Sequence, residues 1–406
     1  MRRLVAWVDD NRAGELTEQH LPEGSLFTFE YEPEAAPRDL VSLTMVPSPS
    51  ERRFETRVFP PPFEMILPEG ARRTRIEAAR KIVRSDDFSL LSYVGANPVN
   101  RVRFLTPGTT PQMPVPEIPT PREIADCTAG RTLFEQLVRD LDLRQGIAGV
   151  QPKILGAPAP PKPSADLRQY RSSTHILKSS TDAYPFLAVN EYACIQAFKS
   201  AGLAVPAVTL SADGELLLVE RFDVLPDGSH LGFEEAAALM GESSATKYQR
   251  DYGSVLEALS QFLSPAAEMA LRRDMTKALV LNWLLGNGDA HLKNFGLLYR
   301  DEADVWLAPF YDCVSTLPYL PNDVPALALS FDWYSKAWWP RAKLEEFAVT
   351  HGRLTPREVA AVIEESRAGA AEGISLLHLL GRRIKRFADL GLRIAALWTE
   401  RMAAFS

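Results

Sequence analysis

Cysteine and long apolar runs are what this sequence has least of. Only three of its 406 residues are cysteines, and Cys127, Cys194 and Cys313 are too scattered to form a zinc-binding spacing or a disulfide framework. So few cysteines fit the reducing cytoplasm. The sequence also contains no run of 18 apolar residues, as a membrane-spanning helix would need, and charge interrupts its N-terminus before a signal-peptide core could form. We therefore expect a cytoplasmic protein with no membrane partner.

An excess of positive charge is also missing. The formal net charge is -7 at pH 7, which argues against nucleic acid binding across the whole surface. Arg382–Arg386 is the densest basic cluster. It could contact DNA phosphates, although a solvated helix face is the more common explanation of such a cluster. Any contact with DNA is therefore expected to be indirect or limited to this local patch.

The most informative feature that is present is a polar motif. Residues 286–294 read Gly-Asn-Gly-Asp-Ala-His-Leu-Lys-Asn and are followed, after a strand-like run, by Tyr311-Asp312. Asp289, which can accept a hydroxyl proton, lies five residues before Asn294, which can ligate a metal. This order, completed by Asp312, is the polar skeleton of a protein-kinase active site.

Phosphoryl transfer requires these residue types because it depends on positioning and charge neutralisation more than on covalent chemistry. We expect Asp289 to orient and deprotonate the acceptor hydroxyl. Asn294 and Asp312 would hold Mg2+ against the nucleotide phosphates, since magnesium prefers hard oxygen ligands. Lys293 could add positive charge near the transferred group.

The Asn-Gly-Asp segment could also be a plain turn after a helix, with His291 and Lys293 merely solvated, because both of its dipeptides favour turns. The surrounding pattern favours the catalytic interpretation. Apolar residues recur at helical spacing before the motif, and 295–299 and 305–310 have the pattern of buried strands that lead to Asp312. Helix, catalytic loop, hairpin and metal-binding Asp thus follow one another in the order that kinases use.

A nucleotide-binding lobe is predicted upstream of the motif. Residues 146–153 form a small-residue loop whose backbone amides could approach phosphates. Lys178 lies in a predicted strand, at the position from which a kinase lysine reaches the α- and β-phosphates. Glu191, at the start of a predicted amphipathic helix, is a candidate partner for Lys178. Residues 216–223 pass from apolar to polar, as expected of a hinge that holds adenine by backbone hydrogen bonds. Each feature alone has a commoner structural explanation, but their order supports a kinase.

Together these motifs resemble the HipA family of serine/threonine kinases, which are the toxin half of bacterial toxin–antitoxin pairs. The resemblance spans residues 1 to about 330, and the C-terminal helices match only loosely. The motifs that carry it are Leu67–Gly70, Asp86–Gly95, Ala148–Lys153, His175–Lys178, Asn190-Glu191, Val219–Asp223, Lys247-Tyr248, Asn287–Phe295 and Leu307–Asp312.

The resemblance implies an α+β, protein-kinase-like bilobal fold of HipA type, with a small strand-rich N-terminal domain and a mostly α-helical C-terminal lobe. It implies that Asp289 is the catalytic base and that Asn294 and Asp312 are the Mg2+ ligands. The residues that it implies for binding the cofactor ATP are Ala148, Gly149, Val150, Gln151, Pro152, Lys153, Lys178, Glu220, Arg221, Phe222, His291 and Lys293.

The implied activity is ATP- and Mg2+-dependent phosphorylation of a serine or threonine on a cellular protein, which arrests growth and leads to persistence. An aminoacyl-tRNA synthetase is the implied substrate, because glutamyl-tRNA synthetase is the family's known target. The implied partner is a helix-turn-helix antitoxin. Two alternatives stay open: a nucleotide-binding regulatory pseudokinase that acts through an antitoxin–DNA complex, and a small-molecule kinase on the same fold.

One position departs from the family pattern. Many members carry a serine just ahead of the nucleotide loop, and its autophosphorylation ejects the loop and switches the enzyme off. Gly146 occupies the equivalent position here and has no hydroxyl. Control through another modified residue or through a partner protein is therefore expected instead.

Proline marks the predicted domain boundaries. Residues 106–122 contain six prolines in 17 positions, which favours an extended connector. This connector would separate an N-terminal domain at 1–105 from a small lobe at 123–225 and a helical large lobe at 226–406. An aromatic cluster at 331–340 is expected to pack in the core, with a partner surface as the alternative. Helices are predicted at 233–240, 255–262, 266–285, 356–365 and 370–402.

Overall fold

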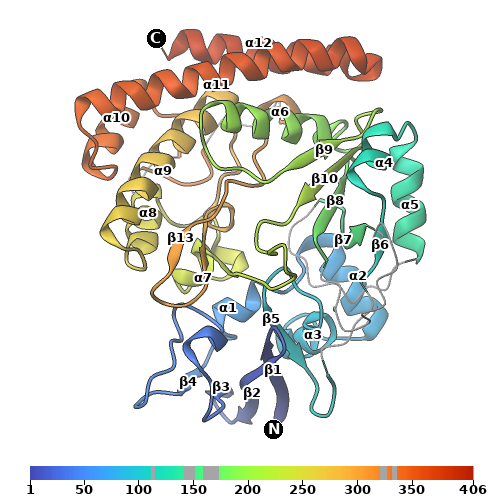
Figure 1. The fold of residues 1–406 in the computed structure, drawn as a ribbon, viewed down its shortest axis with the longest axis vertical. Helices are drawn as coiled ribbons and strands as arrows, with labels where there is room; N and C mark the ends of the chain where they lie inside the picture. The colour runs from blue at the N-terminus through green and yellow to red at the C-terminus, as the bar shows by residue number, and fades with distance from the viewer. Residues whose placement is uncertain (111–114, 141–150, 159–172, 321–326, 332–335, 406) are drawn as a thin grey trace.

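Three regions, each with its own β-sheet, make up the chain. The computed structural model describes residues 1–406 apart from 111–114, 141–150, 159–172, 321–326, 332–335 and 406. In Figure 1 the N-terminal sheet lies at the bottom, the second sheet at the right and two long C-terminal helices across the top.

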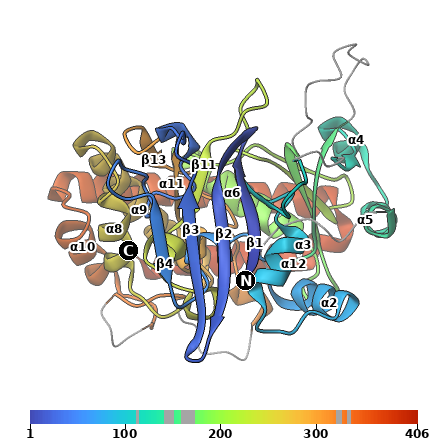
Figure 2. The same cartoon turned by 90° about the horizontal axis from the view of Figure 1, so that it is seen from below.

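The N-terminal region is a five-stranded antiparallel sheet with strand order β4-β3-β2-β1-β5, whose strands β4 to β1 lie side by side in Figure 2. Buried and more exposed residues alternate along much of β2, which gives the sheet an apolar face. Phe29, Phe63 and Phe104 pack edge-to-face in the core that covers this face. The elements are β1 (Arg2–Val8), β2 (Asn11–Leu21), β3 (Gly24–Tyr31), β4 (Arg53–Thr56), α1 (Pro61–Glu64), α2 (Gly70–Arg80), α3 (Asp87–Val94) and β5 (Val102–Leu105).

The second region is a five-stranded sheet of order β6-β7-β8-β10-β9. Its register places Lys153 of β7 opposite Lys178 of β8. Residues 117–118 form β6 and pair in parallel with β7, so the end of the proline-rich segment belongs to this sheet. The elements are β6 (Glu117–Ile118), α4 (Pro121–Asp126), α5 (Gly130–Asp140), β7 (Lys153–Pro158), β8 (His175–Ser179), α6 (Leu187–Ser200), β9 (Val208–Leu210) and β10 (Leu216–Glu220).

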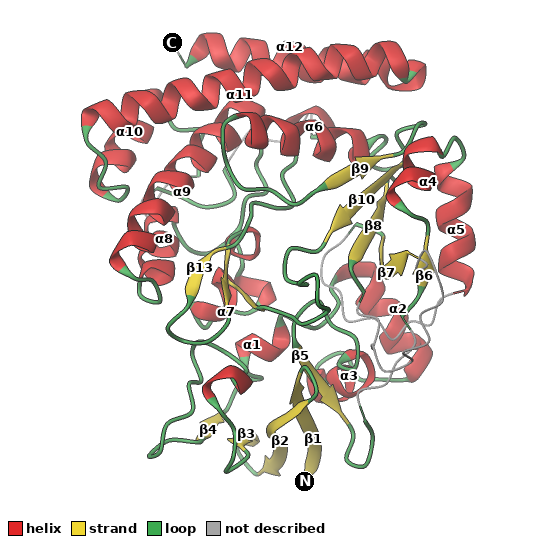
Figure 3. Ribbon diagram, in the orientation of Figure 1, coloured by secondary structure: helices red, strands yellow, loops and turns green. Residues whose placement is uncertain are grey.

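The third region is mostly helical, as Figure 3 shows, around a three-stranded antiparallel sheet. Its central helix, α9, begins at Pro265, and the side chain of the preceding residue, Ser264, caps it by accepting from the Ala267 N–H. None of the helices in the described part of the chain is both long and apolar enough to cross a bilayer. The elements are β11 (Gly232–Glu235), α7 (Ala236–Leu239), α8 (Tyr252–Ser260), α9 (Pro265–Leu285), β12 (Gly296–Tyr299), β13 (Val305–Leu307), α10 (Arg341–Thr350), α11 (Pro356–Arg383) and α12 (Ala388–Ala404).

Three predicted helices differ from the observed ones. Residues 233–235 form β11 and pair with β12, so the helix predicted at 233–240 is wrong in its first half. The helices predicted at 356–365 and 370–402 are divided at the wrong place, because α11 continues without interruption to Arg383. The chain leaves the helical conformation at Ile384, where φ is -106° and ψ is 89°. Buried Ile384 and Phe387 turn into the core at this break, and neither is a residue that sequence reasoning treats as a helix breaker.

Close packing between α11 and α6 depends on Gly369. A Cβ at this position would lie 2.5 Å from the carbonyl oxygen of Ala197 and 2.8 Å from the Cβ of Ala201. We expect Gly369→Ala to lower the free energy of unfolding by about 1–3 kcal/mol, because overpacking such a contact forces the two backbones apart. Denaturant unfolding followed by circular dichroism measures the change.

Gly381, in the same helix, provides the matched control. The atom nearest to an added Cβ there is 3.4 Å away, an ordinary van der Waals contact. Gly381→Ala should leave stability unchanged or raise it by up to about 1 kcal/mol, the difference in helix propensity between the two residues. Equal effects at both positions would show that packing is not what requires glycine at 369.

The described part of the aromatic cluster at 331–340 packs in the core, as predicted. Trp339 is buried, and its ring centroid lies 4.9 Å from that of Phe331 and 5.9 Å from that of Phe347. Residues 332–335 of this cluster lie outside the described part of the chain. Packing between the C-terminal helices therefore accounts for the aromatic residues that can be placed.

Candidate active site

The polar motif begins where α9 ends. Gly286 caps this helix with a φ of 67°, in the left-handed region that favours glycine. The Asn287 side chain donates to Asn282 Oδ1 at 2.8 Å, and its oxygen accepts the N–H of Asp289 at 2.9 Å. Asn-Gly-Asp is thus a turn after a helix, as the simpler interpretation held, and the same turn presents Asp289 to solvent.

Tyr248 holds the carboxylate of Asp289. Its hydroxyl donates to Asp289 Oδ1 at 2.6 Å, and its ring lies edge-on to the imidazole of His291 with the centroids 4.9 Å apart. Burial and the neighbouring Asp289 carboxylate raise the pKa of Tyr248, so its hydroxyl remains a donor at neutral pH. Tyr248 therefore fixes the orientation of the predicted catalytic base.

His291 and Asn294 bond to each other around a single 3-10 turn, η3 (Leu292–Asn294). Asn294 Oδ1 accepts the His291 N–H at 2.9 Å, and His291 Nδ1 accepts the Lys293 N–H at 3.3 Å. Burial lowers the pKa of His291 to about 4, so the imidazole is neutral at pH 7. The His291 N–H also lies 2.9 Å from the carbonyl oxygen of Asp289, so Asp289, His291 and Asn294 share one tight turn.

Side chains from three segments meet at Lys178. Its ammonium, on β8, bonds Glu191 of α6 and Asp312, which confirms the predicted pairing of Lys178 with Glu191. Lys178 and Glu191 are buried, whereas the Asp312 side chain is 40% exposed. Burial opposes the charge on Lys178, but the two carboxylates outweigh burial and raise its pKa. Burial likewise opposes the charge on Asp312, yet Lys178 and Lys153 hold the pKa of Asp312 well below its usual range.

The backbone around Asp312 is held from several sides. Asp312 has a φ of 52°, which is uncommon for a residue other than glycine. The side chain of Asn190, on α6, bonds both the carbonyl and the N–H of Ser315 at 2.8 Å. Ser315 Oγ donates to the Leu285 carbonyl at 2.6 Å and accepts from Trp398 Nε1 at 3.3 Å. Helices α6, α9 and α12 thus converge just behind the predicted metal ligand.

Part of the predicted nucleotide loop lies outside the described residues, namely Ala148, Gly149 and Val150, together with Gly146. The described end of the loop is attached to β8. Gln151 Nε2 donates to the carbonyl of Ser179 at 3.3 Å, and the carbonyl of Pro152 accepts the Ser179 N–H at 3.1 Å. The end of the loop is therefore bonded to Ser179, the residue that directly follows Lys178 on β8.

Lys153 adds a second cation next to Lys178. The two lysines face each other across β7 and β8, and Lys153 interacts with the charges of Asp312 and Glu191. Burial lowers the pKa of Lys153, and the nearby carboxylates oppose that change. Two ammonium groups beside an acidic side chain form a region of charge that suits phosphate groups.

The predicted hinge, Glu220–Phe222, lies at the end of β10. The N–H groups of Glu220 and Arg221 already donate to backbone carbonyls, both at 2.9 Å. The Arg221 guanidinium is buried and pairs with Asp223 at 2.6 Å, and the Phe222 ring packs 5.7 Å from that of Tyr311. An adenine at this segment would therefore have to use backbone groups other than these two donors.

Lys293 belongs to the η3 turn, yet its ammonium meets carboxylates of other segments. It is buried, 2.6 Å from Glu69 Oε1 and 3.4 Å from Glu235 Oε2. Burial opposes its charge, but Glu235 and Glu69 raise the pKa of Lys293. The positive charge is thus balanced within the protein, and binding of a nucleotide by Lys293 stays a prediction.

Sequence reasoning gave no role to Tyr248 or Glu69. Both lie in motifs that carry the family resemblance, Lys247-Tyr248 and Leu67–Gly70. Motif membership was therefore the available signal. It could not show that two distant segments meet at the loop of Asp289, because no local spacing encodes such a contact.

The residues present fit a magnesium ion and a nucleoside triphosphate. The Asp312 carboxylate is partly exposed and Asn294 offers an amide oxygen, so both supply the hard donors that magnesium prefers. The contact of Asp312 with the Lys178 ammonium shows that this carboxylate accepts a cation. Lys153 and Lys178 supply the positive charge that a polyphosphate requires.

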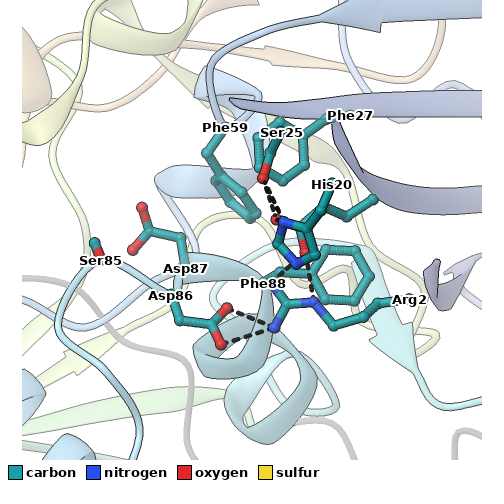
Figure 4. A pocket seen from close by; sticks show the side chains of 10 residues that line it. Arg2, His20, Ser25, Phe27, Phe59, Ser85, Asp86, Asp87 and Phe88 are labelled. Carbon is teal, nitrogen blue, oxygen red and sulfur yellow. Dashed lines mark hydrogen bonds and ion pairs between the residues drawn. The ribbon is translucent and has the colours of Figure 1, made fainter. Parts of the chain in front are cut away.

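A pocket of about 460 Å3 lies in the N-terminal region (Figure 4). The Arg2 guanidinium crosses it, pairs with Asp86 at 2.7 Å and lies 4.8 Å from the centre of the Phe88 ring. None of the predicted site residues lines this pocket, so it is not part of the candidate active site. The lining residues are Arg2, Glu18, His20, Ser25, Phe27, Phe59, Ser85, Asp86, Asp87 and Phe88.

Comparison with known proteins gives matches along most of the chain. Residues 145–374 match the HipA-like C-terminal domain, and residues 4–105 match the HipA N-terminal domain. The chain is 28% identical over 423 aligned positions to "Putative kinase Y4mE" of Sinorhizobium fredii, covering 96% of each protein. It is 27% identical over 274 positions to the serine/threonine-protein kinase toxin HipA of Shewanella oneidensis, covering 63% of this chain and 62% of that protein.

A solved structure has the same fold. It is a chain from the Shewanella oneidensis toxin–antitoxin complex of HipA, HipB and operator DNA, with a TM-score of 0.68 and 21% identity. The match covers 99% of this chain and 96% of that chain. The predicted α+β, protein-kinase-like fold of HipA type is thereby confirmed.

Proposed function

Since this chain belongs to the HipA family, as its motifs predicted and the two domain matches confirm, we propose that it is an ATP- and Mg2+-dependent serine/threonine protein kinase. One observation carries the proposal. Lys178, Glu191 and Asp312 form a cluster that runs from the buried interior to a partly exposed carboxylate.

The energetics of this cluster favour a catalytic role. Removing Lys178 and Glu191 from water costs several kcal/mol per ion, and apolar residues often replace a buried ion pair without loss of stability. Stability alone is therefore a weak reason to bury the pair. Holding an ammonium against phosphate groups, with Asp312 beside it, gives the pair a use that an apolar replacement could not supply.

Each residue of the site then has a task in phosphoryl transfer. Asp289, oriented by Tyr248, accepts the proton of the substrate hydroxyl. The hydroxyl oxygen bonds to the γ-phosphorus, and the bond between that phosphorus and the ADP oxygen breaks. Lys178 and Lys153 balance phosphate charge, and Asn294 and Asp312 are the residues that would hold Mg2+. The ion, when bound, neutralises charge that develops on the phosphate oxygens.

The proposed substrate is a cellular protein, with an aminoacyl-tRNA synthetase as the first candidate, and its phosphorylation would arrest growth. The proposed partner is a helix-turn-helix antitoxin, because the similar solved chain belongs to a complex of HipA, HipB and operator DNA. Direct contact with DNA phosphates is proposed only for the exposed basic side chains at the end of α11. These are Arg382, Arg383, Lys385 and Arg386.

Transfer of labelled γ-phosphate from ATP and Mg2+ to proteins of a cell lysate tests the proposal. The wild-type chain should label a lysate protein, and mass spectrometry then identifies the protein and its modified residue. Asp289→Asn should slow labelling by about 10²–10⁴-fold, the usual contribution of a positioned general base.

Glu302→Gln is the control, because it makes the same carboxylate-to-amide change at an exposed position of the β12–β13 hairpin. It should label as fast as the wild type. ATP binding without any transfer would contradict the kinase proposal and favour the regulatory pseudokinase. Transfer confined to small molecules would favour a small-molecule kinase.

A further inference from the structure

A carboxylate of the N-terminal region reaches the loop that carries Asp289. Glu69 stands at the N-terminus of α2, but its side chain does not cap that helix. Its two oxygens instead accept from two lysines of the helical region, Oε1 from Lys293 at 2.6 Å and Oε2 from Lys247 at 3.0 Å. Residues separated by 224 and 178 positions in the sequence are joined by this one side chain.

Each lysine directly precedes, in the sequence, a residue that belongs to the predicted active site or orients it. Lys247 precedes Tyr248, the residue that donates to Asp289, and the carbonyl of Lys247 accepts the Leu292 N–H at 3.2 Å. Lys293 precedes Asn294, and its carbonyl accepts from the Tyr311 hydroxyl at 2.7 Å. Displacement of either lysine would therefore move a segment that orients the base or a metal ligand.

Glu69 is the carboxylate in this cluster that keeps its charge. Burial alone would raise its pKa, but Lys293 and Lys247 lower the pKa of Glu69 to about 2. Glu235, the other acid near Lys293, lies 3.4 Å away, and burial raises its pKa to about 7 in spite of that lysine. Glu69, from the N-terminal region, is thus a charged carboxylate that bonds both lysines at once.

From these contacts we propose that Glu69 is a positioning residue for Asp289 and Asn294, so that the N-terminal region completes the active site. The inference rests on the proposed kinase function. It assigns Glu69 no contact with substrate or nucleotide. Its effect passes through Lys247 to Tyr248 and through Lys293 to the η3 turn.

Other contacts hold the two regions together and allow docking to be separated from positioning. Glu234, on β11, accepts from the Ser42 hydroxyl at 2.6 Å and from the Leu43 N–H at 2.9 Å. Arg101 donates to the carbonyl of Arg300 at 3.0 Å. None of these contacts touches the Asp289 loop. Glu69→Gln should therefore leave the N-terminal region docked. Glu234→Gln is the matched control, because it removes the charge of another carboxylate that joins the two regions but does not touch the Asp289 loop.

Steady-state kinetics of the intact chain test the proposal. Glu69→Gln should lower kcat by about 10–100-fold, since small displacements of a catalytic group can cost about 10²-fold, and leave the KM for ATP within about 3-fold. Glu234→Gln should retain kcat within about 3-fold even if it destabilises the fold. Adding Lys247→Met to Glu69→Gln should lower kcat little further, because residues that act as one unit are not additive.

A general loss of docking would lower kcat equally in Glu69→Gln and Glu234→Gln, and that result would overturn the proposal. Unchanged kcat in Glu69→Gln, with an active wild type, would also overturn it and leave the kinase function intact.

Hydrogen exchange gives a readout that does not need activity. Amides of residues 290–295 should exchange faster in Glu69→Gln than in the wild type or in Glu234→Gln, because their loop has lost its anchor. If the wild type transferred no phosphate, the proposed function would fail, and exchange would still decide whether Glu69 positions this loop. Equal exchange rates in the three proteins would reject the role of Glu69.

Discussion

Lys178→Met is expected to lower the free energy of unfolding by about 3–5 kcal/mol at neutral pH, the usual loss when one partner of a buried ion pair is removed. The change leaves Glu191, which is 1% exposed, without its ammonium partner. It should also slow phosphoryl transfer by about 10³-fold or more, because groups that neutralise charge on the transferred phosphoryl contribute about 10³–10⁵. Denaturant unfolding and γ-phosphate transfer measure the two losses separately.

The loss of stability in Lys178→Met should depend on pH. Burial raises the pKa of Glu191 above 4.5 even with Lys178 present, and removing the lysine raises it further. A carboxyl group with a higher pKa in the folded state favours folding at low pH, and this contribution is lost as pH rises from the unfolded pKa through the folded pKa. The stability difference from the wild type should therefore be smaller near about pH 5 than near about pH 8.

Adding Glu191→Gln to Lys178→Met separates the two effects. The amide carries no charge, so the double variant should recover much of the stability that the single variant loses. Transfer should stay low, because the Lys178 ammonium is still missing and Lys153 alone remains to balance phosphate charge. Recovery of transfer together with stability would contradict the assignment of phosphate binding to Lys178.

Asp312→Asn is the second change with a large expected effect. Asparagine tolerates the left-handed conformation of this position, where φ is 52°, so the backbone should be kept. Lys178 retains Glu191, and the carboxylate that is lost is partly exposed, so the fold should remain stable. Transfer should fall by about 10³-fold or more, since the site loses the negative charge that we propose holds magnesium. Initial rates over a range of Mg2+ concentrations should show that the variant requires more of the ion.

Asp312→Gly distinguishes the charge from the backbone conformation. Glycine adopts a positive φ without strain but offers no metal ligand. The variant should be as inactive as Asp312→Asn, and added Mg2+ should restore less of its rate. An active Asp312→Gly protein would mean that this residue only shapes the loop behind the site.

Local spacing explains how much of the site the sequence could predict. Asp289, His291 and Asn294 lie within one turn, so their proximity follows from the order of residues. The pairing of Lys178 with Glu191 could be proposed from the order of a strand and a helix. Glu69 could not be placed in this way, because the two ion pairs that it makes span 178 and 224 positions.

The helix ends also differ in whether local sequence marks them. The end of α9 was predicted correctly because Gly286 stops the helix by its own backbone conformation. The break after α11 depends on the burial of Ile384 and Phe387, which no local signal marks. Gly369 weakens the helical pattern in a single sequence, but the structure uses it for close contact with α6. Tertiary packing thus determines where the helices end in the region that the sequence pattern divided wrongly.

The hydrogen bond from Trp398 to Ser315 has a consequence for a chain that is still being synthesised. Residues that hold the site are spread from Glu69, near the start, to Trp398 on the last helix. A nascent chain folds its N-terminal portion first as it leaves the ribosome. No ribosome-bound fragment that ends before Trp398 can form the complete support behind Asp312. Full assembly of the site therefore waits for nearly the whole polypeptide, so any activity of the site would begin only when translation is almost complete.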